Sequence, residues 1–242
     1  MTLKSPAYDV RAHDVVPHDE WIEARRALLV KEKEFTRLRD QLSQARRDLP
    51  WERVEKTYVF DGPDGKETLS ELFGPCSQLV VYHFMFGPDW DAGCKSCSFW
   101  ADNFNGIPAH LRARDITFAA ISRAPLPALE AYEKRMGWSF KWLSSYGTDF
   151  NRDFGVTFTE DEAEGGRAYY NYALQSFPDT EAPGVSVFYK AGDGTVYHTY
   201  SAYGRGIDIL NGAYNYIDLA PKGRDEGDTS QSWVRRHDEY GA

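Results

Sequence analysis

Two of the three cysteines in this 242-residue chain lie close enough in the sequence to act together. They are Cys94 and Cys97, in the segment "FGPDWDAGCKSCSFW". A pair at this spacing can cycle between dithiol and disulfide, can provide two ligands of a metal site, or can consist of two inert buried thiols. The pair alone does not decide among these three interpretations, so the elements around it must.

The cysteines stand between a predicted strand and a predicted helix. The segment "QLVVYHFMFG" before them is an unbroken apolar run, which indicates a central strand buried on both faces. The segment "SCSFWADNFNGI" indicates a helix that begins at or near the pair. In open α/β sheets, functional groups gather beyond the carboxyl ends of the strands. This position favours a redox-active pair over inert thiols.

The start of a helix would also activate one of the two thiols. Unpaired N–H groups and the helix dipole stabilise a thiolate there, and Lys95 places a positive charge between the cysteines. We therefore expect a lowered pKa for Cys94 and assign it as the attacking nucleophile. Cys97, about one turn further into the helix, would resolve the mixed disulfide. The predicted partner is a disulfide or thiol of a protein or of a small molecule.

Two other uses of the pair stay open. A structural zinc site normally has four ligands, often from two such pairs, and only Cys76 and six scattered histidines remain to complete one. A metal site on Cys76, Cys94 and Cys97 is therefore the weaker alternative, and we predict no bound metal or cofactor. The other alternative is a non-enzymatic module that binds partners in a groove around Trp90 and Tyr203.

Several residues near the pair are candidates for a supporting role. His83 lies in the strand that leads to the motif, either as a core histidine or as a proton acceptor under Cys97, because a histidine titrates near neutral pH. Trp90 could line a partner groove. Asp91 is either a solvated loop acid or, if it approaches Cys94, a group that would raise the pKa of that thiol.

Pro183 and Gly184 come immediately before a predicted strand at residues 185–189. A cis-proline before that strand would lie against a redox disulfide. Cis peptide bonds occur mainly before proline, but they are a minority even there, so the sequence leaves the isomer open.

Alternating strands and helices predict an α/β fold with a central mixed sheet flanked by helices. The segment "DITFAAIS" indicates a second buried strand, "PLPALEAYEKRMGW" a helix, and "GVSVFYKAGDGTVYHTYSAYG" a hairpin around the turn "AGDG". We divide the chain into a helical extension at residues 1–50, the sheet domain at residues 51–220 and an irregular C-terminal tail at residues 221–242. Within the domain, residues 147–178 are expected to be irregular.

Residues 18–48 are predicted to form one long helix with an apolar stripe on a charged surface. The stripe recurs every seven residues, at Trp21, Leu28, Phe35 and Leu42. We expect it to pack against its own domain or a neighbouring subunit, so a homodimer is one expected assembly. A dimeric coiled coil is less favoured, because Lys31 interrupts the inner seam.

Composition excludes several classes of protein. The net charge is -9, so the chain lacks the basic surface that nucleic-acid binding requires. It contains no apolar run of the roughly 20 residues that span a bilayer, and its N-terminus has no apolar export signal. Three cysteines do not suit a disulfide scaffold. We therefore expect a cytoplasmic protein that binds neither nucleic acid nor membrane.

The longer motifs resemble one family of the thioredoxin-like superfamily, the bacterial proteins of domain of unknown function 899. The resemblance rests on "VVYHFMFGPDWDAGCKSCSFWADNFNG", "FAAISRAPLPALEAYEKRMGWSFKWLSSYGTDFNRDFGV", "PGVSVFYK" and "TYSAYGRGIDILNGAYNYIDLAPKGRDE". It implies a thioredoxin-like fold and a dithiol–disulfide oxidoreductase that uses Cys94 and Cys97.

The chain also departs from the better known members of that superfamily. Gly93 stands where thioredoxin has a tryptophan, His83 is the nearest counterpart of its buried acid, and Gly184 aligns with its cis-proline. Gly87 and Asp91 replace the proline and threonine that precede the reactive cysteine of the peroxidase variants. These departures favour disulfide exchange over peroxide reduction, with a specialised partner or a small-molecule disulfide as substrate.

Overall fold

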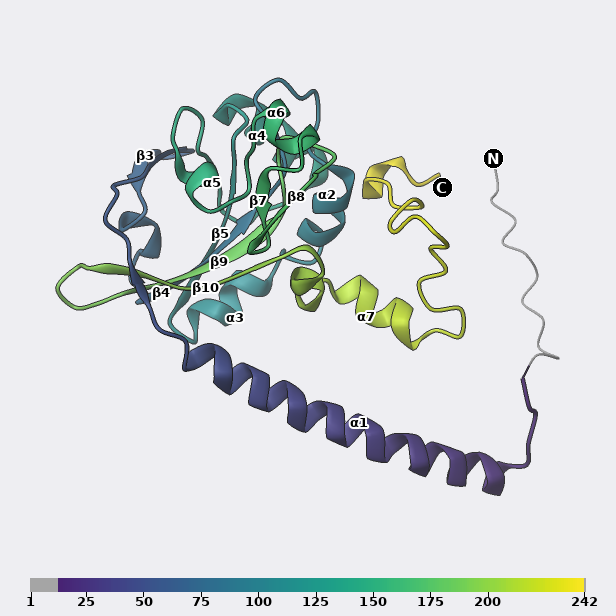
Figure 1. The fold of residues 1–242 in the computed structure, drawn as a ribbon. Coiled ribbons are helices and arrows are strands. Elements are labelled where there is room, and N and C mark those ends of the chain that lie inside the picture. The colour runs from purple at the N-terminus through teal and green to yellow at the C-terminus, as the bar shows by residue number, and fades with distance from the viewer. Residues whose placement is uncertain (1–12, 242) are drawn as a thin grey trace. The chain divides into compact units, whose positions relative to one another are not determined.

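The structure is a computed structural model that describes residues 13–241. The chain divides into two compact units, one that ends at Leu49 and one that begins at Pro50 (Figure 1). The residues that we expected to form a separate C-terminal tail belong to the second unit. In the described part of the chain, no helix is long and apolar enough to cross a membrane.

The first unit contains one long helix, α1 (His18–Arg47). Asp19 and Glu20 stand in its first turn and Arg46 and Arg47 in its last, where their charges complement the helix dipole. The helix forms where the apolar repeat predicts it. Within this unit, the described residues provide no second helix or strand to cover the stripe.

The second unit is built on an eight-stranded sheet in the order β1-β10-β9-β4-β5-β6-β2-β3. Its strands are β1 (Glu52–Arg53), β2 (Val59–Gly62), β3 (Gly65–Thr68), β4 (Gln78–His83), β5 (Ile116–Ser122), β6 (Trp142–Ser144), β9 (Gly184–Lys190) and β10 (Val196–Tyr203). A separate two-stranded sheet pairs β7 (Ala168–Tyr170) with β8 (Ala173–Gln175).

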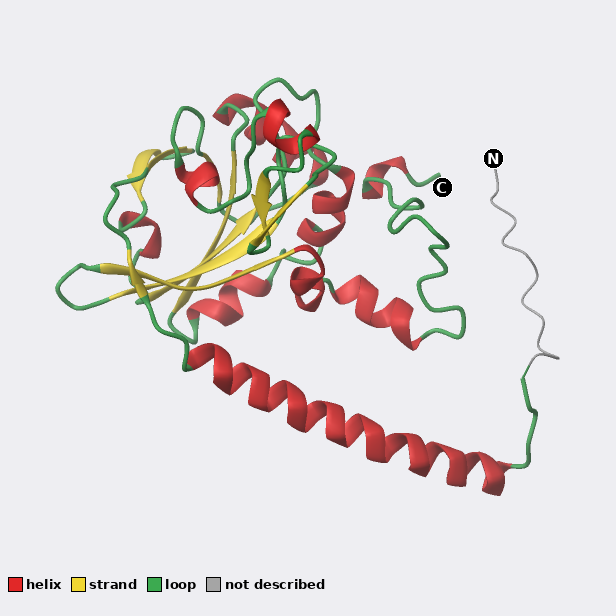
Figure 2. Ribbon diagram, viewed as in Figure 1, coloured by secondary structure: helices red, strands yellow, loops and turns green. Residues whose placement is uncertain are grey.

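Short helices connect and flank these strands (Figure 2). The α-helices are α2 (Lys95–Ala101), α3 (Ile107–Arg112), α4 (Leu126–Met136), α5 (Phe150–Asp153), α6 (Glu160–Glu164) and α7 (Gly212–Leu219). The 3-10 helices are η2 (Glu71–Phe73), η3 (Gly204–Leu210) and η4 (His237–Glu239).

Strand β4 lies in the middle of the sheet and leads directly to the cysteine motif. It pairs in parallel with β5, with Val81 opposite Ala119, and antiparallel with β9, with Val81 opposite Ser186. Strands β9 and β10 form the predicted hairpin. Two parallel strands joined by helices, followed by an antiparallel hairpin on the other side of the central strand, form the expected thioredoxin-like α/β fold.

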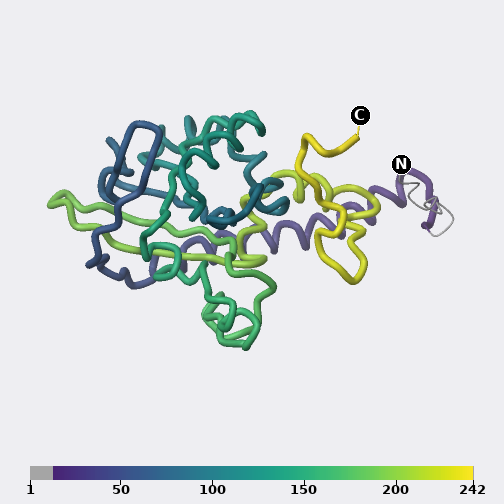
Figure 3. The backbone as a smooth tube through the Cα atoms, turned by 90° about the horizontal axis from the view of Figure 1, so that it is seen from above, coloured from purple at the N-terminus to yellow at the C-terminus, as the bar shows by residue number. Residues whose placement is uncertain are grey.

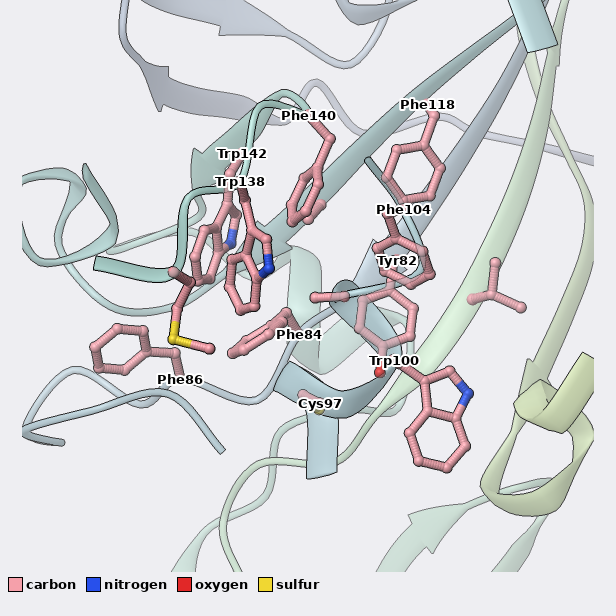
Figure 4. Packing of buried hydrophobic residues seen from close by; sticks show 14 of the residues in the cluster. Tyr82, Phe84, Phe86, Cys97, Trp100, Phe104, Phe118, Trp138, Phe140 and Trp142 are labelled. Atoms are coloured by element: carbon pink, nitrogen blue, oxygen red, sulfur yellow. The ribbon is translucent and has the colours of Figure 1, made fainter. Parts of the chain in front are cut away.

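Side chains of β4 alternate between two cores, as they must along any strand. Tyr82 packs on one face of the sheet in an aromatic cluster with Phe84, Trp138 and Trp142 (Figure 4). Val81 packs on the opposite face in a second cluster. The prediction that this strand is buried on both faces is therefore confirmed.

Two details of the local structure differ from the prediction. The helix expected over residues 96–107 is shorter than predicted, because α2 ends at Ala101. A new helix, α3, begins at Ile107, directly after Gly106, which adopts a left-handed conformation with φ 84°. The segment at residues 147–178, expected to be irregular, contains α5, α6, β7 and β8 (Figure 1). The green part of the tube in Figure 3 follows the path of this segment. Helix α6 is fixed by a capping box in which Thr159 and Glu162 bond each other's backbone N–H.

Candidate active site

The backbone of Met85 holds both cysteines at the start of α2. The Met85 carbonyl accepts a hydrogen bond from the Cys94 N–H at 3.0 Å. The Met85 N–H in turn donates to the Cys97 sulfur at 3.4 Å. Cys94 is the N-cap residue of α2, so its carbonyl accepts the first helical N–H bond, from Ser98. The end of β4 thus fixes the pair where the apolar run and the helix meet.

The two thiols have opposite environments. Both are free, but Cys94 is only partly buried whereas the Cys97 side chain is 1% exposed. A hydrogen bond from the Cys97 thiol lowers the pKa of Cys94 to about 6, with smaller help from the N–H groups of Cys97 and Ser96, and outweighs the opposing effect of burial. Burial, together with the adjacent Cys94 sulfur, raises the pKa of Cys97 well above its usual value.

Lys95 contributes less to this asymmetry than the sequence suggested. Its side chain is exposed to solvent, where screening weakens its field at the sulfur. The principal causes of the lowered pKa of Cys94 are the Cys97 thiol and the N–H groups at the start of the helix. The N–H groups at the start of the helix therefore account for more of the lowered pKa than Lys95 does.

Gly93 has no room for a side chain. A Cβ atom there would lie 2.7 Å from the Phe84 ring and 3.0 Å from the Tyr132 ring. This crowding explains why no tryptophan precedes Cys94 in this chain. The Gly93 carbonyl accepts hydrogen bonds from the Arg236 guanidinium, at 2.7 Å from Nη2 and 3.2 Å from Nε.

Arg236 also joins a hydrogen-bond network behind Cys94. Its Nε donates to the Tyr132 hydroxyl at 2.7 Å. That hydroxyl lies 2.9 Å from the Ser98 hydroxyl, which donates to the Cys94 carbonyl at 2.8 Å. The C-terminal segment, which sequence reasoning left without a role, therefore helps to position the loop that carries Cys94.

Other contacts hold this C-terminal segment in place. Arg135 on α4 forms an ion pair with Asp238 at 2.7 Å. The Nδ1 atom of His237 lies 2.7 Å from the Asp102 carboxylate. No local motif could have predicted these contacts, because they join residues more than 100 positions apart.

His83 lies away from the cysteine pair. Its ring is on the opposite face of the sheet, 5.5 Å from the Phe150 ring, and its Nε2 atom lies 2.8 Å from the Ser186 hydroxyl. Burial lowers the pKa of His83 to about 3, so the ring is neutral. The proposed role as a proton acceptor under Cys97 is therefore wrong, and the core-histidine interpretation fits. The residue of β4 that faces the pair is its neighbour, Tyr82.

The remaining candidate residues are spread around the site. Trp90 is half-buried and packs against the backbone of Gly87, and Asp91 is exposed. Every peptide bond among residues 13–241 is trans, including the one before Pro183. Gly184 pairs with His83 at the start of β9.

Tyr203 does not form an open groove with Trp90. It is 8% exposed and donates its hydroxyl hydrogen to the Phe154 carbonyl at 2.9 Å. Its ring packs against Gly184, in a different hydrophobic cluster from Trp90. The structure thus brings Cys94, Cys97 and Trp90 to one region and leaves Tyr203 in another.

Cys76 lies at the opposite end of β4 from the pair. It precedes Gln78, the first residue of a six-residue strand, whereas the motif follows the last one, a separation of roughly 20 Å. Within the described residues, no group of three or more His, Cys, Asp or Glu side chains could hold a metal ion. A metal site on Cys76, Cys94 and Cys97 is therefore excluded by geometry.

The sequence of this chain matches a known family over almost its whole length. Residues 10–240 match the family described as "Bacterial protein of unknown function (DUF899)". The chain belongs to this family. The resemblance inferred from the motifs is thereby confirmed. No curated protein matches the chain.

Several solved structures are similar to the DUF899 chain. Peroxidoxin BcpB from Mycobacterium tuberculosis has a TM-score of 0.46 and 13% identity, over 69% of this chain and 96% of that one. A PrxQ variant from Xylella fastidiosa has a TM-score of 0.42 and 11% identity, over 69% and 95%. A putative thiol:disulfide interchange protein DsbE from Chlorobium tepidum has a TM-score of 0.40 and 13% identity, over 71% and 97%. Because these TM-scores are below 0.5, the roles assigned below rest on contacts within this chain.

The contact between the C-terminal segment and the loop that carries Cys94 is testable by mutation. Arg236→Ala should lower the free energy of unfolding by about 1–3 kcal/mol, because the Gly93 carbonyl and Tyr132 hydroxyl lose a charged hydrogen-bond donor. Denaturant unfolding followed by tryptophan fluorescence measures this loss. Arg235→Ala is the matched control, since Arg235 is exposed, and should change the value by less than about 0.5 kcal/mol. Equal effects of the two substitutions would contradict the assigned contact.

Proposed function

We propose that this chain is a thiol–disulfide oxidoreductase in which Cys94 is the nucleophile and Cys97 the resolving thiol. The observation that carries the proposal is the asymmetry between the two sulfurs. Cys94 is partly exposed with a pKa lowered to about 6, and Cys97 is buried with a raised pKa. At neutral pH the first is a thiolate that can attack, and the second is a protected thiol beside it.

In the reducing direction, the Cys94 thiolate attacks one sulfur of a substrate disulfide R–S–S–R. A Cys94–SR bond forms as the substrate bond breaks, and the departing RS⁻ takes up a proton. Cys97 then loses its proton and attacks the Cys94 sulfur, which forms the intramolecular disulfide and releases the second RS⁻. The pair is oxidised by two electrons, and the substrate is reduced to two thiols. Oxidation of a substrate dithiol is the same sequence in reverse.

The surroundings of Cys94 favour exchange with a disulfide that approaches from the solvent side. Cys97 is closed off by the aromatic cluster of Tyr82 and Trp100, so an external disulfide can reach only the Cys94 sulfur. The half-buried Trp90 packs at the edge of the same cluster and offers an apolar surface to the substrate. Both a protein disulfide and a small-molecule disulfide meet these requirements.

Removal of the nucleophile tests the proposal most simply. Cys94→Ser should abolish catalysed reduction of insulin and of hydroxyethyl disulfide by dithiothreitol, because a serine hydroxyl does not attack sulfur under these conditions. The rate above the uncatalysed background is the measurement. Cys76→Ser is the matched control and should keep the rate of the unaltered protein, since Cys76 lies at the far end of β4. Turnover that survives in Cys94→Ser would show that Cys94 is not the nucleophile.

The lowered pKa of Cys94 predicts how its reactivity depends on pH. In a Cys76→Ser protein, the rate of Cys94 alkylation by iodoacetamide should rise with pH through a midpoint near 6, because the thiolate is the reactive form. Replacing Cys97 with alanine removes the largest cause of the shift, so the midpoint should move up toward about 8.5. Mass spectrometry of quenched samples gives both profiles. A midpoint near 8.5 before Cys97 is replaced would contradict the assigned environment.

A further inference from the structure

The proposed exchange requires Cys97 to act in a state that its environment disfavours. Cys97 must become a thiolate to attack the mixed disulfide on Cys94. Its side chain is nevertheless buried, and the only backbone donor that bonds its sulfur among the described residues is the Met85 N–H, at 3.4 Å. A second group that stabilises the thiolate would remove this difficulty. The role of such a group rests on the proposed function.

Tyr82 places a hydroxyl group next to the buried sulfur. It is the residue of β4 whose side chain points to the face of the sheet covered by α2, and it is 0% exposed. Figure 4 shows its hydroxyl oxygen directed toward Cys97. The Phe104 ring meets the tyrosine ring edge-on at 4.9 Å and the Phe84 ring does so at 6.4 Å, so the tyrosine is held in place.

The hydroxyl of Tyr82 stands out among the buried tyrosines. Among the described residues, it is a buried side-chain oxygen with no hydrogen-bond partner. The other buried tyrosine hydroxyls are all hydrogen-bonded, at Tyr58, Tyr132, Tyr170, Tyr203 and Tyr214. An unpaired buried donor costs free energy, and phenylalanine would fill the same space without that cost. The hydroxyl therefore contributes little to folding, and its position suits a donor that is used only when the neighbouring sulfur is charged.

We propose that the Tyr82 hydroxyl stabilises the Cys97 thiolate during resolution by donating a hydrogen bond to its sulfur. The tyrosine keeps its proton throughout, since burial and the nearby sulfur raise its own pKa well above 10. The proton of Cys97 leaves with the departing thiolate of the substrate, so the step needs no further reactant. Hydrogen bonds to charged acceptors are stronger than those to neutral ones, so the bond favours the thiolate over the thiol.

Few other groups could take this role. Among the described residues, the groups that interact electrostatically with Cys97 or bond its sulfur are Cys94, Tyr82, the Met85 N–H and the Tyr170 hydroxyl. Cys94 carries the substrate sulfur in the mixed disulfide and no longer titrates. Tyr170 donates its hydroxyl hydrogen to the Pro183 carbonyl at 2.7 Å. Of these groups, Tyr82 is therefore the one whose side-chain hydroxyl has no other acceptor.

A two-step reagent separates attack by Cys94 from resolution by Cys97. In a reduced Cys76→Ser protein, 5,5′-dithiobis(2-nitrobenzoate) should release one equivalent of coloured thiolate as Cys94 attacks and a second as Cys97 resolves. Tyr82→Phe should leave the first phase unchanged and slow the second at least about tenfold at neutral pH, the loss expected for one hydrogen bond to a charged group. The second phase of the variant should also reach its maximum at a higher pH. A purely structural role of Tyr82 would not separate the two phases in this way.

Tyr170→Phe is the matched control, because it removes a neighbouring buried hydroxyl that is bonded elsewhere. Its second phase should keep the rate of the Cys76→Ser parent, while its midpoint of thermal unfolding should fall. The Tyr82→Phe protein should be at least as stable as the parent. An unchanged second phase in Tyr82→Phe, or equal slowing in both variants, would overturn the role of Tyr82 and leave the redox pair intact. A parent protein that releases no second equivalent would overturn the proposed function and the role of Tyr82 together.

Discussion

The electrostatic interaction between the Cys97 thiol and the Cys94 sulfur is the one on which the properties of the site depend. It is the largest cause of the lowered pKa of Cys94, and the same proximity helps to raise the pKa of Cys97. The Met85 carbonyl bonds the Cys94 backbone N–H and the Met85 N–H bonds the Cys97 sulfur, so the segment that follows β4 positions both residues. The sheet thereby determines which of the two sulfurs is charged, and the proposed order of attack and resolution follows.

The rest of the domain holds the two cysteines in place and shields Cys97 from solvent. Aromatic side chains on one face of the sheet enclose Cys97, while the C-terminal segment reaches back across the molecule to bind Gly93 through Arg236. Gly93 cannot carry a side chain because the Phe84 and Tyr132 rings occupy the space. Arg236 bonds the loop that carries Cys94, and the Phe84 and Tyr132 rings pack against it. Of the two sulfurs of the pair, Cys94 is the accessible one, as the proposed attack by Cys94 requires.

The sequence predicted the position of the cysteine pair between a central strand and a helix well, and the surroundings of the pair less well. The apolar run of β4, the spacing of the cysteines and the hairpin signal were sufficient for the thioredoxin-like fold, because each reports a local preference. The sequence could not predict which side chains of β4 point to which side of the sheet. A continuous apolar run lacks the alternation that would assign His83 to one core and Tyr82 to the other. The contact between Arg236 and Gly93 could not be predicted either, because the two residues are 143 positions apart in the sequence. Contacts of that kind depend on tertiary structure that no motif records.

The reduction potential of the Cys94–Cys97 pair tests the central claim most directly. The protein would be equilibrated in graded thiol–disulfide buffers, trapped with an alkylating reagent and analysed by mass spectrometry. We predict a single two-electron transition between roughly -120 and -270 mV, the range of working disulfide exchangers, with Cys76 reduced throughout. If no intramolecular disulfide formed at any potential, the pair would not be a redox centre and the proposed function would be wrong.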